Sequence, residues 1–332
     1  MADLTTKYLG LSLTNPLIVG SSGLTNSAEN ILDLEKAGAG AVVLKSLFEE
    51  QIMLEVDASL KEAYQNDMIY SAKSETLDYI DVHIRERTLS AYIELIKETK
   101  NRVMIPVIAS INCVSSAEWI SFANQFEQAG ADALELNIAI LPSDEKTEPD
   151  KIEKIYFDII NKVKSELRIP VSVKISPYFT NLASMVKKLS ETGIQGIVMF
   201  NRFYTPDYDI NNFEEKSSNT FSSPRESGNV SRWMGILSPK VGCDLAASSG
   251  IHSDEDLIKQ LLAGATAAQV VSTIYKNGKD QIQKMLSGLN KWMDDKGYSS
   301  IEQFRGKLSQ AESSNPSAYE RIQFMKYFSE IQ

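Results

Sequence analysis

The chain has 332 residues, of which 43% are hydrophobic and 23% are charged, and its formal net charge is −10. This length suits a single eight-stranded α/β barrel, which typically takes about 250 residues plus insertions. The acidic balance argues against nucleic acid and anionic membrane surfaces as partners, because both attract basic faces. We therefore expect a small-molecule substrate, no nucleic-acid partner and no membrane attachment.

The N-terminal sequence and the scarce metal-binding residues bear on location and cofactor. The first ten residues, MADLTTKYLG, lack the basic segment and apolar core of a signal peptide. The cysteines, Cys113 and Cys243, are too few for a disulfide framework or an iron–sulfur cluster. With two histidines and no HExxH or CxxC motif, no metal site is expected. The prediction is a cytoplasmic protein.

Taken in chain order, the sequence predicts a hairpin and then eight strands. Residues 5–15, TTKYLGLSLTN, alternate in polarity around a glycine, which predicts a hairpin that closes the bottom of a barrel. Short apolar runs follow at 17–20, 41–45, 106–111, 133–138, 171–176, 196–201, 244–249 and 267–272. With helical patterns between them, these runs predict an α/β fold, a (β/α)8 TIM barrel, as a single domain over residues 1–332. An open doubly wound sheet is the alternative.

The same junction recurs before four of these runs. In segments 34–45, 126–137, 189–201 and 261–272, an amphipathic helix ends, a glycine follows, and an apolar run begins after a short gap. A glycine suits the position after a helix end, where the backbone turns left-handed. The apolar runs are typical of parallel strands covered on both sides.

Two connections are longer than the fold requires, and the C-terminal segment looks peripheral. Segments 46–75 and 202–236 follow the second and sixth strands. Both leave from the ends of strands where barrels build their active sites, so we expect lids or binding loops. Residues 298–332 are predicted to form peripheral C-terminal helices.

Polar residues end most of the predicted strands. They are Ser21, Ser22, Lys45, Ser46, Ser110, Asn112, Asn137, Lys174, Ser176, Asn201, Ser248, Ser249, Ser272 and Thr273. Any one of them could be an ordinary wet strand end. Two lysines together with asparagines favour an acceptor-rich, partly anionic ligand, because a buried lysine is costly unless it is paired. The serine-rich, glycine-containing ends of strands seven and eight match the phosphate site of such barrels.

These residues carry a family likeness. The chain resembles the dihydroorotate dehydrogenases, most closely the soluble class 1 type, over nearly its whole length. The matching segments are NPLIVGSSG (15–23), VVLKS (42–46), ELN (135–137), VKISPYF (173–179), SSGI (248–251) and LLAGATAAQVVSTIYKNG (261–278). The resemblance implies an FMN-binding barrel that oxidises dihydroorotate to orotate in pyrimidine biosynthesis, and a homodimer.

The resemblance also implies a set of cofactor-binding residues. Lys174 would lie against the N1/O2 side of the flavin, where a fixed ammonium stabilises negative charge on the reduced ring. The full set is Ser22, Gly23, Lys45, Ser46, Asn112, Asn137, Lys174, Asn201, Ser249, Gly250, Ser272 and Thr273. Of these, Ser249, Gly250, Ser272 and Thr273 would hold the phosphate.

The substrate half of the family pattern is not matched. The family's catalytic base, a cysteine or serine, aligns with Ile140, which cannot accept a proton. Ser143 and Cys113 are weak substitutes. The residue after Asn201 is the bulky Arg202 rather than a small hydroxylated one. We therefore expect weak or no activity on dihydroorotate, since general-base catalysis contributes about 10²–10⁴-fold, and another substrate is conceivable.

Two other functions remain open. Barrel lyases also place a lysine at a strand end near a phosphate site, and Lys174 or Lys45 would then form a Schiff base. A non-catalytic flavin-binding protein is the second alternative, and it would hold FMN without turning it over.

Overall fold

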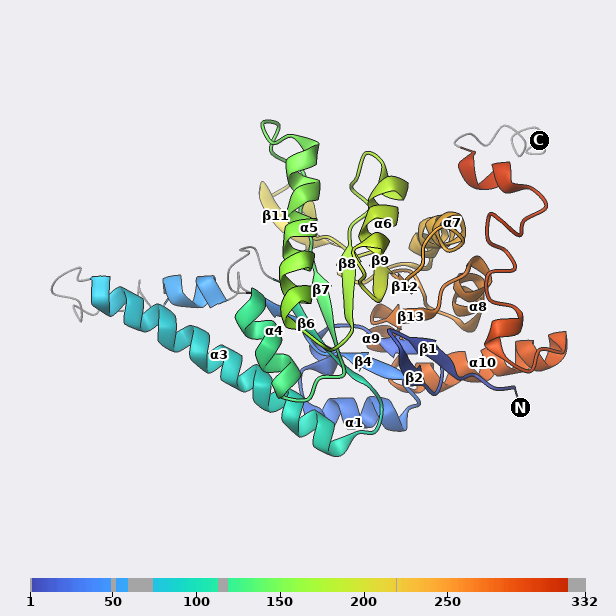
Figure 1. Ribbon diagram of the computed structural model, residues 1–332, viewed down its shortest axis with the longest axis horizontal. Helices are drawn as coiled ribbons and strands as arrows, with labels where there is room; N and C mark the ends of the chain where they lie inside the picture. The colour runs from blue at the N-terminus through green and yellow to red at the C-terminus, as the bar shows by residue number, and fades with distance from the viewer. Residues whose placement is uncertain (1, 49–51, 59–73, 113–118, 219, 322–332) are drawn as a thin grey trace.

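The fold is a closed barrel of eight parallel strands (Figure 1). The computed structural model describes residues 2–48, 52–58, 74–112, 119–218 and 220–321. The barrel strands are β3 (Leu17–Val19), β4 (Ala41–Val43), β6 (Val107–Asn112), β7 (Ala133–Asn137), β8 (Val171–Ile175), β9 (Gly196–Met199), β12 (Asp244–Ser248) and β13 (Ala267–Val270). Parallel pairing of β4 with β6 closes the ring, and β5 (Leu47–Phe48) extends it beside β6. The TIM-barrel prediction is confirmed, and the doubly wound alternative is wrong because an open sheet has no closing pair.

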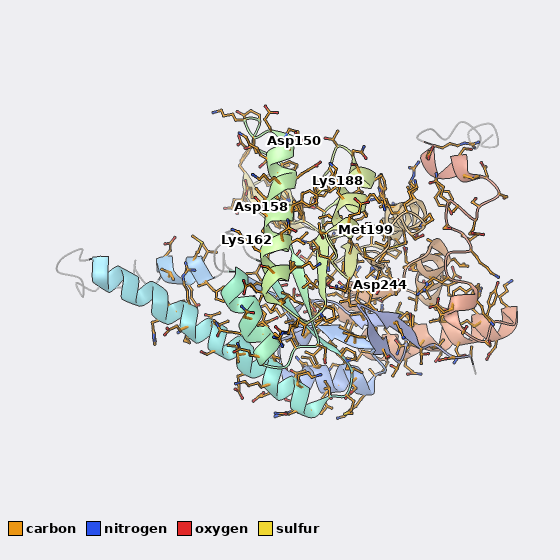
Figure 2. The ribbon with its side chains drawn as sticks, in the orientation of Figure 1. Asp150, Asp158, Lys162, Lys188, Met199 and Asp244 are labelled. Atoms are coloured by element: carbon orange, nitrogen blue, oxygen red, sulfur yellow. The ribbon has the colours of Figure 1, made fainter. Side chains whose placement is uncertain are left out.

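Helices cover the outside of the barrel (Figure 1). They are α1 (Ala28–Lys36), α3 (Ser74–Arg102), α4 (Trp119–Gln128), α5 (Pro149–Glu166), α6 (Leu182–Glu191), α7 (Ser227–Leu237), α8 (Asp254–Ala263), α9 (Ser272–Asn277) and α10 (Asp280–Lys296). On α5, for example, Tyr156 and Ile160 are fully buried. Charged residues such as Asp158 and Lys162 stand on its exposed face (Figure 2).

The four junction glycines adopt the predicted left-handed backbone. Their φ angles are 100° at Gly38, 98° at Gly130, 80° at Gly193 and 110° at Gly264. A residue with a Cβ is disfavoured in this region, so glycine lets each helix end and the chain reverse into the next strand. The repeated junction in the sequence thus marks four of the turns that build the barrel.

The N-terminal hairpin closes the lower end of the barrel, as predicted. Strands β1 (Thr6–Tyr8) and β2 (Leu11–Leu13) pair antiparallel. Tyr8, Leu9 and Leu13 are buried together with inward residues of the barrel strands. A Cβ on Gly196 would lie 2.5 Å from Leu9 Cδ2, so the glycine makes room for the plug. Asp244, labelled in Figure 2, accepts a 2.7 Å hydrogen bond from the Leu9 backbone N–H.

The two insertions differ in content from plain loops. The first contains β5 and a helical stretch at 52–58, and residues 59–73 lie outside the described part. The second forms an exposed hairpin of β10 (Thr205–Asp209) and β11 (Glu214–Ser218), then the 3-10 helix η2 (Pro224–Glu226). Helix α7 begins at Ser227, so the predicted loop 202–236 ends about ten residues early, because its last part is the barrel helix after β9.

The C-terminal segment is less helical than predicted. From residue 298 to 321 the chain forms two short 3-10 helices, η3 (Ile301–Gln303) and η4 (Pro316–Glu320). Phe304 is fully buried against Trp292 and Tyr298, which anchors this segment to α10. The rest of the predicted peripheral helices, residues 322–332, lies outside the described residues.

Candidate functional site

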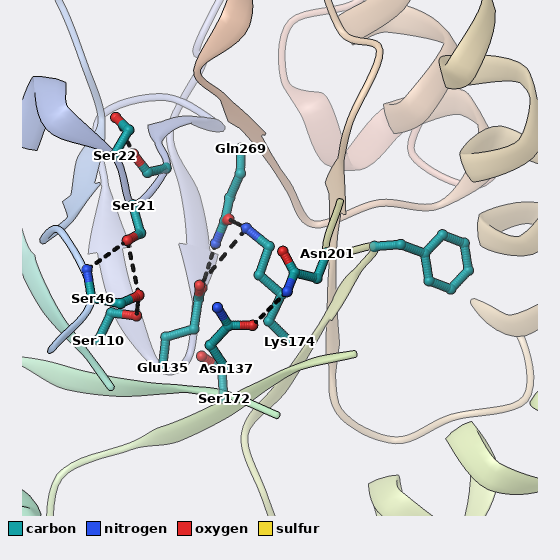
Figure 3. A network of polar contacts seen from close by, with 12 residues as sticks. Ser21, Ser22, Ser46, Ser110, Glu135, Asn137, Ser172, Lys174, Asn201 and Gln269 are labelled. Atoms are coloured by element: carbon teal, nitrogen blue, oxygen red, sulfur yellow. Dashed lines mark hydrogen bonds and ion pairs between the residues drawn. The ribbon is translucent and has the colours of Figure 1, made fainter. Parts of the chain in front are cut away.

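The upper half of the barrel interior is polar. Side chains along a strand alternate between the two faces, so Ala133, Glu135 and Asn137 of β7 all point inward. Ser172 and Lys174 of the neighbouring β8 do the same, in register with Glu135 and Asn137. The interior therefore changes from apolar groups near the hairpin to ionisable and amide groups near the C-terminal ends of the strands. Figure 3 shows the polar groups.

Lys174 lies in the centre of this polar layer. Its Nζ donates a 2.9 Å hydrogen bond to Gln269 Oε1 and lies 4.0 Å from Glu135 Oε1. Gln269 Nε2 in turn donates to Glu135 Oε2 at 2.5 Å. Because Gln269 belongs to β13 and Glu135 to β7, this triangle spans the barrel (Figure 3). Burying the lysine is tolerable because a carboxylate and an amide oxygen face it.

Burial dominates the electrostatics of Lys174. The side chain is 11% exposed, and desolvation lowers its pKa, while the Glu135 carboxylate acts in the opposite direction. The Glu135 side chain is 1% exposed, and its Oε1 atom has no hydrogen-bond partner among the described residues. The Lys174 ammonium is thus the positive charge that faces the buried Glu135 carboxylate, one of whose oxygens has no hydrogen bond among the described residues.

An amide pair stands beside the lysine. Asn201 Nδ2 donates to Asn137 Oδ1 at 2.9 Å, and Asn201 Oδ1 accepts from the Arg202 backbone N–H at 2.9 Å. Asn201 follows β9 and Asn137 ends β7, so the pair bridges over the intervening β8 (Figure 3). These contacts fix both amides in one orientation at the mouth of the barrel.

A chain of hydroxyl groups lines the opposite side of the mouth. The Oγ atoms of Ser21 and Ser46 are 3.0 Å apart, and those of Ser46 and Ser110 are 2.7 Å apart. Tyr92 from α3 donates to the Ser110 carbonyl at 3.0 Å and accepts from its N–H at 2.9 Å. This network joins the ends of β3, β4 and β6 (Figure 3).

A cavity of about 320 Å³ opens above Lys174, within the range of small-molecule sites. It is lined by Ser21, Lys174, Phe200, Asn201, Arg202, Phe203, Tyr204, Thr205, Thr220, Ser222, Ser248, Ser249, Gly250, Ile251, Gln269, Val270, Val271 and Ser272. Of the predicted cofactor residues, the cavity brings together Lys174, Asn201, Ser249, Gly250 and Ser272. Residues far apart in sequence therefore meet at one site.

The end of the cavity away from Lys174 is built from backbone. Ser249 and Gly250 have φ angles of 82° and 77°, which turn the chain sharply after β12. A Cβ on Gly250 would lie 2.2 Å from the Ser227 backbone nitrogen, so only glycine fits this approach. Ser272 Oγ accepts a 2.9 Å hydrogen bond from the Ser222 N–H, which draws the second insertion over the cavity.

Other predicted cofactor residues lie elsewhere. Lys45 and Ser46 line a second cavity of about 290 Å³ with Tyr92. Thr273 is fully buried and donates to the His252 carbonyl at 3.0 Å, so it supports the loop after β12 and does not line the main cavity. Asn112 ends β6 opposite Phe48 of β5 and lines neither cavity.

The short helix after β3 places two more of the predicted residues. Ser22 caps η1 (Gly23–Thr25) by accepting from the Leu24 N–H at 3.3 Å. A Cβ on Gly23 would lie 2.7 Å from the Tyr275 hydroxyl, so this glycine is set close to α9. Neither residue lines the main cavity.

On the family resemblance, a catalytic base would stand at Ile140. Ile140 is half-buried and packs against the hydrophobic core after β7. Ser143 is exposed, and its N–H bonds back to the Leu141 carbonyl. Cys113 lies outside the described residues. Within the described ranges, no group of three or more His, Cys, Asp or Glu residues is arranged to hold a metal ion.

Glu135 and Gln269 are two site residues for which the sequence predicted no role. Both sit in runs that otherwise read as buried strand, and both are nearly inaccessible to solvent. The available signal was the period of two along β7, which places Glu135 on the same side as Asn137. Gln269 has the same relation to Ala267, which lies in the apolar layer below it.

Comparison with known proteins agrees with this geometry. The family model described as dihydroorotate dehydrogenase matches residues 3–293. The chain belongs to the dihydroorotate dehydrogenase family. It is 26% identical over 314 residues to the catalytic subunit of dihydroorotate dehydrogenase B (NAD(+)) from Thermoplasma acidophilum, covering 92% of this chain and 99% of that protein. The Pyrococcus furiosus protein of the same name is 24% identical over 308 residues, covering 90% and 97%. The family assignment made from the motifs is therefore confirmed.

The described helices also bear on membrane association. None of the helices in the described part of the chain is long and apolar enough to cross a membrane.

Proposed function

We propose that the protein is an FMN-dependent oxidoreductase of the dihydroorotate dehydrogenase type. The observation that carries the proposal is the cavity that joins the buried Lys174 to the backbone turn at Ser249 and Gly250. A cation at one end and close-packed backbone at the other suit a ligand with an acceptor-rich ring and a phosphate.

The residues present fit FMN on two counts. Lys174 lines the cavity with only one of its hydrogen-bond donors used by Gln269, so it has donors to offer. Gly250 permits the tight turn after β12, and Ser272 at the start of α9 lines the same cavity with a hydroxyl group. Bound FMN would supply hydride acceptance, and this chain would contribute a fixed positive charge and orientation.

The substrate side supports a narrower proposal, namely weak turnover of dihydroorotate. The family resemblance places the catalytic base at Ile140, and this side chain packs against the hydrophobic core. Arg202 occupies the cavity wall and is engaged by Glu226 Oε2 at 3.0 Å and by the Thr220 carbonyl at 3.0 Å. The space next to Asn201 therefore differs from the family pattern, and a different reduced small molecule is the proposed substrate.

The first test is an absorbance spectrum of the purified protein, followed by anaerobic addition of dihydroorotate. We expect a flavin spectrum that bleaches slowly or not at all. Rapid bleaching would refute the narrower proposal, because another residue would then be taking the proton. A colourless protein that also fails to bind added FMN would refute the flavin assignment itself.

A variant sharpens the test at the phosphate end. Ser272→Asp keeps an acceptor for the Ser222 N–H but adds a negative charge to the cavity wall. We expect it to weaken FMN binding strongly and to leave riboflavin, which lacks the phosphate, little affected. Ser165→Asp, on the exposed face of α5, is the matched control and should bind FMN like the wild type. Equal loss of both ligands in Ser272→Asp would mean that the phosphate does not lie there.

One observation favours a second candidate, Schiff-base chemistry at Lys174. Burial lowers the pKa of this lysine. A lowered pKa favours the neutral amine, which is the form that acts as a nucleophile. Borohydride reduction in the presence of carbonyl compounds, followed by mass spectrometry of the 171–176 segment, would detect it. A trapped adduct on Lys174 in a protein without flavin would favour the lyase over the oxidoreductase.

We further propose a homodimer, on the family resemblance alone, and a cytoplasmic location, on the scarcity of cysteines. Light scattering after size-exclusion chromatography would give the mass in solution. A mass near 36.9 kDa, that of one chain, would contradict the dimer.

A further inference from the structure

Glu135 is the least explained ionisable group in the barrel. Its side chain is 1% exposed, and only one of its two oxygens, Oε2, has a hydrogen bond, from Gln269. Oε1 has none among the described residues and lies 4.0 Å from Lys174 Nζ. A buried carboxylate costs free energy unless it is paired, and Glu135 does not line the main cavity itself. Its place below Lys174 points to a role that acts through the lysine.

The triangle of side chains fixes the direction of the ammonium. Gln269 bonds to both partners, with its Oε1 accepting from Lys174 and its Nε2 donating to Glu135. The amide therefore has one orientation that satisfies both neighbours, and the carboxylate determines it, since ionised Glu135 can only accept. With Gln269 fixed in this way, Lys174 Nζ is held at the floor of the cavity.

We propose that Glu135 is a positioning residue that keeps Lys174 charged and, through Gln269, directed into the cavity. The inference deepens the proposed function, on which its relevance to flavin binding rests. The positive charge of the site then depends on Glu135 as well as on Lys174.

Few other ionisable groups face this pair among the described residues. Tyr8 approaches from the hairpin below, and the Glu135 charge helps to raise its pKa, after burial. Tyr92 on α3 lies on the far side of Glu135 and has its pKa raised, chiefly by burial. Arg202 and Tyr204 stand across the cavity. Of these groups, the one that opposes the effect of burial on the Lys174 pKa is Glu135.

The direct test compares FMN affinity with pH in the wild type and in Glu135→Gln. FMN is titrated into apoprotein and followed by quenching of flavin fluorescence. In the wild type, affinity should fall at an alkaline pH where Lys174 loses its proton. In Glu135→Gln the loss of affinity should occur at a pH about 1–3 units lower, because an opposite charge at this distance usually shifts a pKa by that amount. A fall at the same pH in both proteins would overturn the proposal.

Two controls define the source of the effect. Asp244→Asn removes a half-buried carboxylate at the other end of the barrel and should leave the fall in affinity at the same pH as in the wild type. Lys174→Met should have lower affinity at every pH and no fall from lysine titration. If Asp244→Asn shifts the fall as much as Glu135→Gln does, general charge or stability is responsible, and the proposal is wrong.

A second measurement separates this inference from the proposed function, because it needs no flavin. Urea unfolding of the apoprotein is followed between about pH 7 and pH 9, below the usual tyrosine pKa of about 10. A lysine with a lowered pKa in the folded state makes stability rise with pH between its folded and unfolded pKa values. In Glu135→Gln this rise should begin at a lower pH.

The two outcomes are distinguishable. An earlier rise in a protein that refuses FMN would refute the flavin function and leave the pairing of Glu135 with Lys174 established. An unchanged rise would overturn the pairing, whether or not FMN binds.

Discussion

The two ends of the barrel interior are built from the same strands and filled in opposite ways. At the lower end, Ala133 and Ala267 face Leu9 and Leu13 of the hairpin in a sealed apolar cluster. Two residues further along each of the same two strands stand Glu135 and Gln269, which belong to a polar network open to a cavity. A shift of one inward position therefore changes the interior from a packed core to a binding site.

This difference separates stability from function along the barrel axis. Apolar groups sealed from water stabilise the fold by about 25 cal/mol per Å² buried, whereas buried charges must be compensated. The lower end has backbone contacts that lock the plug, such as Leu9 N–H to Asp244. Among the described residues, the hydroxyls of Thr6 and Tyr8 at the lower end and Glu135 Oε1 at the upper end all lack a hydrogen bond. Glu135 is the carboxylate among them, and a purely structural core would not need it.

The largest effect is expected from breaking the charge pair at the upper end. Lys174→Met leaves the Glu135 carboxylate buried without its cation, which typically costs about 3–5 kcal/mol. The double variant Lys174→Met, Glu135→Leu removes both charges and should recover most of that loss. The free energy of unfolding from urea titrations at neutral pH measures both.

Ligand binding should not recover with stability in that double variant. If the double variant is as stable as the wild type but cannot bind FMN, the charge pair is needed for binding and not for stability. If Lys174→Met alone is as stable as the wild type, Glu135 is not held as a charged partner, and the polar layer is wrongly described.

A slightly smaller effect is expected from opening the lower end. Leu9 is 1% exposed, and Leu9→Ala should create a cavity in the plug that costs about 2–5 kcal/mol. Leu141→Ala, at a leucine that is 60% exposed beyond β7, is the matched control and should change stability by less than about 0.5 kcal/mol. FMN affinity should be unchanged in folded Leu9→Ala, and a large loss would show that the two ends are coupled.

The sequence predicted the lower end and the barrel well because both follow from periodic patterns. The hairpin alternation and the repeated helix–glycine–strand junction are local signals, and Gly38, Gly130, Gly193 and Gly264 all have the backbone they require. At the upper end, one cavity is lined by Lys174, Asn201, Ser249 and Ser272, because the closed sheet brings these strand ends to one mouth. Their role in cofactor binding stays a prediction.

What the sequence did not predict depends on contacts between distant elements. The pairing of Glu135 with Gln269 joins residues 134 positions apart, and no local pattern encodes it. Thr273 was assigned to the phosphate, yet its hydroxyl is turned toward His252 by the first turn of α9. The exposed hairpin β10–β11 was missed because TPDYD and EEKSS lack an apolar face.

A third prediction concerns the wall that the second insertion adds to the upper end. Arg202 bonds to Glu226 and to the Thr220 carbonyl, and it is 27% exposed. Arg202→Ala should cost at most about 1 kcal/mol, because a partly exposed pair contributes little. Hydrogen exchange at residues 220–226 should nevertheless become faster. Lys216→Ala, which breaks the exposed pair with Asp209 in the hairpin, is the control and should leave exchange there unchanged.

The smallest effect is expected from acid, through His252 at the rim of the cavity. Burial and the nearby Lys276 lower the pKa of His252, while Asp256 partly opposes them. The folded state therefore resists protonation, and stability should fall as the pH drops below about 6.5 toward the folded pKa. His252 Nε2 lies 2.9 Å from Ser222 Oγ, so the cost falls on the contact that holds the second insertion over the cavity.

Two variants test this prediction. Urea unfolding at about pH 8 and about pH 5 should differ less in His252→Gln than in the wild type, because the titrating group is gone. Lys276→Gln keeps a donor for the Ser222 carbonyl but removes the repelling charge, so it too should reduce the difference. An undiminished loss in both variants would assign the acid sensitivity to other groups. It would also show that the charges of His252 and Lys276 at the rim, unlike those of Lys174 and Glu135, do not contribute to stability.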